Sequence, residues 1–198
     1  DADVTVECGT VYADAGATAM DTCEGDLTAG IVVGGDVVDV NMPGTYVATY
    51  NVSDSAANAA AEVTRTVVVT DTTAPTLLLA GNPTVVVECG SVYVDAGATA
   101  LDSCDGNLTA TIVVGGDVLD MGTPGDYTIT YNVSDSSANA AAEITRLITV
   151  ADATAPVITL QGVPWLTLEL CPGDDVPALP GAMAIDACEG NLTGNIVV

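Results

Sequence analysis

The chain has 198 residues and a formal net charge of −25, because 27 acidic side chains face two arginines, with no lysine or histidine. Hydrophobic residues make up 49% of the chain, which argues against the disorder that such a charge usually indicates. Nucleic acid is excluded as a partner, because nothing here could neutralise phosphates, and anionic membrane surfaces are disfavoured for the same reason. Calcium is the expected counter-ion, since carboxylate oxygens are nearly the only ligands on offer.

The predicted elements are all β-strands. Polar residues alternate with valine and cysteine at residues 3–8, which predicts a first strand with one buried face. Two more alternating strands, at 46–52 and 61–69, flank the loop SDSAANAA, which predicts a hairpin with Val63 opposite Val52. Helix caps and helical periodicity are missing, and no long apolar run is present. We therefore expect no membrane insertion, and a mature secreted chain or a segment of one.

The whole pattern repeats. The stretch ECGTVYADAGATAMDTCEGDLT from Glu7 returns as ECGSVYVDAGATALDSCDGNLT from Glu88, an offset of 88 − 7 = 81 residues. A third, divergent copy stops before it is complete. We expect three domains, at residues 1–71 (without its first strand), 72–152 (complete) and 153–198 (partial). About seven short strands per repeat predict a β-sandwich.

The six cysteines are distributed as two in each of the three repeats. Taken as neighbours, they form the pairs Cys8/Cys23, Cys89/Cys104 and Cys171/Cys188, with separations of 15, 15 and 17 residues. A zinc site would need CxxC spacing or histidines, and neither is present. We therefore expect one local disulfide per repeat, formed in an oxidising compartment. Closing a loop of about 15 residues stabilises by about 3 kcal/mol in the chain-entropy model.

Each repeat carries an acidic loop, DTCEGDLT, DSCDGNLT or DACEGNLT, beginning at Asp21, Asp102 or Asp186. One interpretation is a tight turn in which the glycine adopts a positive φ and an Asp or Asn caps the backbone. The other is a calcium site, although the ligand spacing does not match an EF-hand. Both interpretations stay open, and an ion here would need oxygen atoms from a second loop.

The linkers offer a second place for calcium. One aspartate precedes the rigid Thr-Ala-Pro of each linker, as in cadherin-type arrays, and Asp54 and Asp135 lie in loops that could add ligands. The candidate calcium ligands are Asp21, Glu24, Asp26, Asp71, Asp102, Asp105, Asn107, Asp152, Asp186, Glu189 and Asn191.

The two arginines, Arg65 and Arg146, fall on the apolar side of corresponding strands. They are either ligand-binding groups or structural cations, stacked on Tyr50 or Tyr131 and paired with a carboxylate. Recurrence at the same place in each repeat favours the structural role.

Four asparagines begin N-x-S/T sequences that a secreted protein could glycosylate: Asn51, Asn107, Asn132 and Asn191. Chance occurrence is the alternative, because such sequences are common and two of them lie inside a predicted strand. An enzyme is not expected, since no histidine or lysine is available as a base and the cysteines are predicted to be paired. A two-carboxylate glycosidase is compatible with the composition, but identical acids in every repeat indicate a copied structural module.

Several stretches resemble the bacterial immunoglobulin-like repeats of secreted surface proteins, which are similar in style to hyalin-type repeats. They are DTTAP (Asp71–Pro75), ECGSVYVDAGATALDSCDGNLT, the PGxYxxxYNVSDS segment and the ExTRxxxV strand. The resemblance implies an all-β fold of tandem Ig-like β-sandwich repeats of about 81 residues, located outside the cell or on its surface. It implies adhesion, stalks or surface assemblies rather than catalysis.

We predict a structural subunit or stalk segment of an extracellular surface fibre, stabilised by calcium and self-associating through its incomplete ends. The alternatives are an adhesin that recognises a glycan or a cell-surface protein, and a non-catalytic spacer of a secreted enzyme. Copies one and two agree through nearly every loop, which favours the structural array, because the binding loops of an adhesin would differ.

Overall fold

The computed structural model describes residues 3–162 and 181–197. The predicted all-β fold is confirmed: the described elements are β-strands and three 3₁₀ turns of three residues each. None of these helices is long or apolar enough to span a membrane. The chain forms two compact units. Unit 1 comprises residues 1–78, 98–113 and 132–143, and unit 2 comprises residues 79–97, 114–131 and 144–198.

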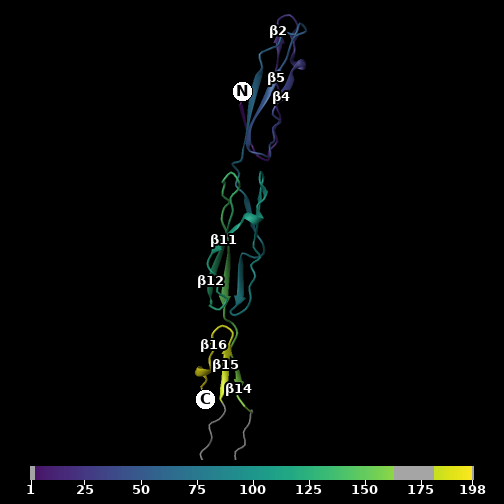
Figure 1. The fold of residues 1–198 in the computed structure, drawn as a ribbon. Helices are drawn as coiled ribbons and strands as arrows, with labels where there is room; N and C mark the ends of the chain where they lie inside the picture. The colour runs from purple at the N-terminus through teal and green to yellow at the C-terminus, as the bar shows by residue number, and fades with distance from the viewer. Residues whose placement is uncertain (1–2, 163–180, 198) are drawn as a thin grey trace, which may run out of the picture. The chain divides into compact units, whose positions relative to one another are not determined.

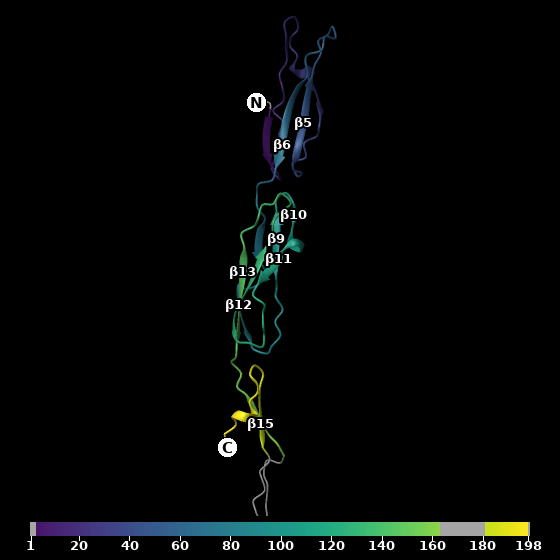
Figure 2. The same ribbon diagram turned by 60° about the vertical axis from the view of Figure 1, so that its left-hand side comes forward.

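The main sheet of unit 1 has the strand order β1-β6-β5-β4. These strands are β1 (Asp3–Glu7), β4 (Val32–Gly35), β5 (Gly44–Asn51) and β6 (Val63–Thr70). Strand β1 runs parallel to β6, while β5 is antiparallel to it, so the first strand of the repeat lies beside the last (Figure 2). Tyr50, and not Val52, lies opposite Val63, so the expected register was wrong by two residues. A slip of two keeps every side chain on its predicted face, because side chains alternate with a period of two.

Each acidic loop forms the turn of a short hairpin. In the first repeat β2 (Met20–Asp21) pairs with β3 (Gly25–Asp26), and in the second β9 (Ala98–Asp102) pairs with β10 (Gly106–Asn107). A 3₁₀ turn follows each, η1 (Thr28–Gly30) or η2 (Thr109–Thr111). In the second repeat β7 (Thr76–Leu79) adds a strand on the other edge of β9, whereas β2 pairs only with β3 among the described residues.

Unit 2 repeats the same design. Its four-stranded sheet has the order β11-β12-β13-β8, formed by β8 (Thr84–Glu88), β11 (Val113–Gly116), β12 (Gly125–Asn132) and β13 (Ile144–Ala151). The third repeat contributes β14 (Val157–Leu160), β15 (Ala182–Asp186) and β16 (Gly190–Asn191), which lie side by side in Figure 1, and the turn η3 (Thr193–Asn195).

The core is thin and lies on one face of each main sheet. Val67, Val69 and Tyr50 are buried in unit 1, and Ile148, Val150 and Tyr131 occupy the corresponding places in unit 2. Burial of alternate side chains is what the period-two pattern predicts. Other apolar side chains are exposed at corresponding positions of the repeats: Val11 and Val92 are 95% and 92% accessible, and Val37 and Val118 are 90% and 91%.

Candidate functional site

The disulfides join successive repeats. Cys8, at the end of β1, is bonded to Cys104 in the acidic loop of the second repeat, and Cys89 is bonded to Cys188 in the acidic loop of the third. The predicted pairing within each repeat is therefore wrong for these four cysteines. Cys23 is exposed and has no partner among the described residues, and Cys171 lies outside them.

A glycine after each first-strand cysteine allows the backbone to approach the acidic loop closely. Gly9 has φ +76°, and a Cβ atom placed on it would lie 2.7 Å from the carbonyl oxygen of Ser103. Gly90 has φ +75°, and its Cβ would lie 2.6 Å from the carbonyl oxygen of Ala187. Only glycine fits both the left-handed conformation and this spacing, so the Cys-Gly pair is the structural basis of each disulfide junction.

The first aspartate of each acidic loop caps the turn that presents the cysteine. Asp102 Oδ1 accepts hydrogen bonds from the backbone N–H groups of Cys104 (2.7 Å) and Asp105 (2.9 Å). The same pair of bonds forms around Asp21 and Asp186. The glycine of each loop has a positive φ, as the turn interpretation predicts.

The residue after that glycine caps the following 3₁₀ turn. Asp26 Oδ1 accepts the N–H of Thr28 at 2.9 Å, and the amide oxygens of Asn107 and Asn191 accept the equivalent bonds at 3.0 Å. Asp and Asn interchange here because the cap needs one acceptor oxygen and no charge.

The middle acid of the loop holds a second loop of the same repeat. Glu24 accepts hydrogen bonds from the backbone and hydroxyl of Ser55, and Asp105 accepts them from Ser136 (2.6 and 2.9 Å). Ser55 and Ser136 belong to the SDS loops between the two long strands of each repeat. Glu24 and Asp105 therefore connect the acidic loop of their repeat to its SDS loop.

Three aspartates from different segments converge within unit 1, at the junction of the first and second repeats. Carboxylate oxygens of Asp71 in the linker, Asp102 in the acidic loop and Asp135 in the SDS loop all lie within 4.8 Å of one another. Asp71 and Asp135 are each 8% exposed. The second carboxylate oxygens of Asp71 and Asp102 are buried without a hydrogen-bond partner. Burial raises the pKa of Asp71, and the charges of Asp135 and Asp102 raise it further.

The described part of the second junction holds a less complete set. Asp186 corresponds to Asp102, is 5% exposed, and also has a buried carboxylate oxygen without a partner. Asp152 corresponds to Asp71 but is exposed, as is Glu189. The acids predicted as ligands are thus brought together only in part, and the one complete cluster among the described residues is at the first junction.

A glutamate before each first-strand cysteine holds the linker, a role that the sequence analysis missed. Glu7 accepts bonds from the N–H and hydroxyl of Thr72 (2.8 and 2.9 Å) and from the hydroxyl of Thr73. The backbone bond from Thr72 is the main reason why the pKa of Glu7 lies below its usual value. Glu88 accepts the N–H of Ala153 in the same way. Recurrence of Glu-Cys-Gly in both repeats was the available signal.

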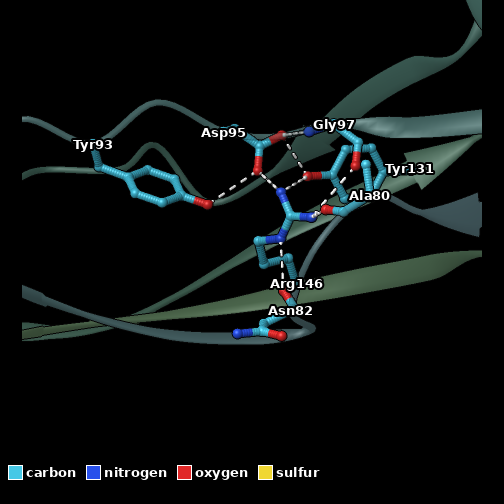
Figure 3. Close-up of polar contacts among 7 residues, drawn as sticks. All are labelled: Ala80, Asn82, Tyr93, Asp95, Gly97, Tyr131 and Arg146. Carbon is cyan, nitrogen blue, oxygen red and sulfur yellow. Dashed lines mark hydrogen bonds and ion pairs between the residues drawn. The ribbon is translucent and has the colours of Figure 1, made fainter.

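Arg146 is the centre of a polar network inside unit 2 (Figure 3). Its guanidinium pairs with Asp95, lies 5.9 Å from the ring centroid of Tyr131, and is 1% exposed. It donates to the backbone carbonyls of Ala80, Asn82 and Gly97. The hydroxyls of Tyr131 and Tyr93 both donate to Asp95. The network holds the DAG segment and the turn before β8 against the sheet, which fits a structural arginine.

Arg65 occupies the corresponding place in unit 1. It pairs with Asp14 at 2.7 Å, lies 5.5 Å from the ring centroid of Tyr50, and donates to the carbonyl of Gly16. Its side chain is 15% exposed. The aspartate partners of both arginines, Asp14 and Asp95, begin the repeated DAG sequence, and no local pattern links that sequence to the arginines.

The four candidate glycosylation sites fall in two settings. The amide nitrogens of Asn51 and Asn132, where a glycan would attach, donate to Glu62 and Glu143 at 2.8 and 2.7 Å. Asn107 and Asn191 are exposed in the acidic loops, with their amide oxygens used as caps.

The sequence matches a known protein family over most of its length. The family described as "Bacterial surface protein, Ig-like domain" matches residues 1–69 and 77–150, well over half of the chain. A curated relative, the pesticidal crystal protein Cry22Aa of Bacillus thuringiensis, is 29% identical over 149 residues. That match covers 67% of this chain and 20% of the relative, so the chain spans about a fifth of the relative's length.

Two solved structures are similar to parts of this chain. The lipoprotein BT2262 of Bacteroides thetaiotaomicron is 24% identical with a TM-score of 0.36, over 56% of this chain and 54% of that one. A structure of the CBM51-2 and INT domains of Clostridium perfringens ZmpB in complex with GlcNAc is 25% identical with a TM-score of 0.33. It covers 44% of this chain and 20% of the other.

Proposed function

Because the chain belongs to the family of bacterial surface protein Ig-like domains, we propose that it is a non-catalytic structural segment of an extracellular stalk or fibre. Its repeats act as stiff elements that are locked together covalently and stabilised by calcium. The observation that carries this proposal is the pairing of Cys8 with Cys104 and of Cys89 with Cys188, each joining one repeat to the next.

A disulfide between repeats restricts bending at the linker, which a short peptide alone would allow. Glu7 supports the same restraint, because it holds Thr72 and Thr73 of the linker against the end of β1. Interfaces between domains of one chain otherwise permit relative motion unless they are large and apolar. A covalent bond and a backbone clamp at each junction would keep successive repeats from bending against one another.

Two features of the first repeat favour assembly with a further repeat of the same kind. Cys23 occupies the loop position that Cys104 and Cys188 use for bonding, and it is exposed. A groove of about 390 Å³ lies along β2, lined by Met20, Leu27 and Val52 among others. In the second repeat β7 pairs with β9 at the corresponding place. A strand and a cysteine from another repeat, in the same chain or a neighbouring subunit, would complete both.

Exposed valines at repeated positions support contacts between subunits. Val11 and Val92 share one position in the repeat, Val37 and Val118 share another, and all four are at least 90% accessible. Each repeat therefore offers the same exposed apolar positions to a neighbouring subunit. Burial of these side chains between subunits would account for the high apolar content of so acidic a chain.

Electron microscopy of surface material from the producing bacterium tests the proposal. Gold-labelled antibodies against this chain should mark extended fibres, and thiol reduction should make those fibres flexible or break them. Label confined to dispersed monomers before and after reduction would overturn the fibre role. Shortened or softened fibres after calcium chelation would support the calcium component.

A further inference from the structure

The convergence of Asp71, Asp102 and Asp135 points to a calcium site that pins the linker to the second repeat, and we infer that this is where the stalk binds its ion. The inference rests on the proposed calcium-stabilised stalk and assigns the residues that bind. One ligand comes from the linker after the first repeat, and two come from loops of the second. All three segments belong to unit 1.

Burial without a partner is the observation that distinguishes this cluster from the many exposed acids of the chain. Asp71 is 8% exposed, and its Oδ2 atom is buried without a hydrogen bond. One carboxylate oxygen of Asp71 lies within 4.8 Å of carboxylate oxygens of the other two residues. Asp102 Oδ2 is orphaned in the same way. A buried charged oxygen without a partner carries the full cost of desolvation, so the site needs a cation or a proton.

No side chain of this protein can supply that cation. The sequence has no lysine or histidine, and its two arginines are paired with Asp14 and Asp95. The donors are all carboxylate oxygens, which suits a hard divalent ion and disfavours zinc or copper. Two ligands of one calcium ion, with bonds of about 2.4 Å each, can lie up to about 4.8 Å apart, and these oxygens lie within that separation of one another.

Neighbouring groups orient the carboxylates toward one another. The N–H groups of Cys104 and Asp105 hold Asp102 by its Oδ1 atom, whereas its Oδ2 atom is buried and makes no hydrogen bond. Asn139 donates to both oxygens of Asp135 and also, at 3.1 Å, to the backbone carbonyl of Asp71. Asn139 is thus a positioning residue that connects the SDS loop to the linker, and oriented ligands of this kind are typical of metal sites.

Calcium chloride titrated into the full chelator-treated chain is the test, with binding and thermal unfolding both measured. Asp71→Asn should weaken binding at this site at least about tenfold, because ligand charge sets calcium affinity. Without calcium the same variant should melt higher than the wild type, since it removes an unneutralised buried charge. With calcium the order should reverse. Asp39→Asn, which removes one charge from an exposed turn outside the cluster, should change neither measurement.

The reversal separates a calcium ligand from a merely structural aspartate. If Asp71→Asn melts lower than the wild type both with and without calcium, the side chain is a hydrogen-bonding group and the inference is wrong. Equal calcium binding by wild type, Asp71→Asn and Asp135→Asn would also overturn it, as would equally strong binding of magnesium with no preference for calcium. These measurements do not depend on the disulfides or on fibre formation, so failure here leaves the covalent stalk untouched.

Discussion

Cys8 of the first repeat is bonded to Cys104 of the second, 96 residues later, rather than to Cys23 in its own repeat. In the chain-entropy model a closed loop of about 100 residues stabilises by about 4.7 kcal/mol, against about 3 kcal/mol for about 15 residues. Connecting the repeats therefore restricts the unfolded chain more than local bonds would. The Cys8–Cys104 bond therefore stabilises the junction between two repeats and not a single repeat.

Limited cleavage at arginine distinguishes the two pairings directly. Trypsin should cut the unfolded, unreduced chain only after Arg65 and Arg146, giving fragments 1–65, 66–146 and 147–198. Each fragment contains one of the locally predicted pairs, so local disulfides would release three separate fragments. With Cys8–Cys104 and Cys89–Cys188, all three fragments should stay linked until a reductant is added. Mass spectrometry of the unreduced digest gives the answer.

Replacement of Gly9 by alanine should weaken the first junction. The new Cβ would lie 2.7 Å from the carbonyl of Ser103, in addition to the left-handed strain of about 1–2 kcal/mol. Gly106→Ala is the matched control, because Gly106 has φ +73° and no atom within 4 Å of its Cβ position. We expect Gly9→Ala to lower the urea midpoint more than Gly106→Ala and to slow formation of the Cys8–Cys104 bond. Equal effects would mean that the close approach is unimportant.

Loss of Arg146 should be more damaging than loss of Arg65. Arg146→Ala removes the cation that pairs with Asp95 and one donor from each of three backbone carbonyls, in a site where the Arg146 side chain is 1% exposed. Removing one partner of a buried pair costs about 3–5 kcal/mol. Arg65→Ala should cost less, because its side chain is 15% exposed and so remains partly hydrated. Urea unfolding of both variants checks the order, and an inverted order contradicts the network.

Acid should destabilise the fold through the aspartates that face the arginines. Partial burial alone would raise the pKa of Asp95, but hydrogen bonds from Tyr131 and Arg146 outweigh it and lower that pKa. Tyr50 and Arg65 lower the pKa of Asp14 in the same way. A depressed carboxyl pKa contributes stability that is complete above the unfolded value of about 3.9 and is lost as pH falls through the folded value.

Urea midpoints measured between pH 7 and pH 2 test this contribution. They should fall below about pH 4, and Asp95→Asn should flatten part of that fall, because the variant has no carboxyl to protonate. Asp3→Asn, at an exposed position of β1, should keep the slope of the wild type. An unchanged slope in Asp95→Asn would show that other carboxylates govern acid unfolding.

Much of the fold was predictable because it follows from local alternation and from the repeat. Strand faces, the hairpin of each repeat and the positive φ in the acidic loops came from patterns of a few residues. The roles of Arg65 and Arg146 were also expected, although their aspartate partners were not. The sequence indicated Asp71 and Asp102 as candidate ligands but not that they meet, since they lie 31 residues apart and come together only when the junction folds.

By itself the sequence determined the strands, the period of 81 residues and the two cysteine positions of each repeat. It could not determine which cysteines are bonded, because a tandem repeat makes Cys23 and Cys104 equivalent: 23 + 81 = 104. The tertiary structure decided between them, because β1 runs parallel to β6 and so ends beside the linker that leads into the next repeat. There Gly9 lets the strand end touch the next acidic loop rather than its own.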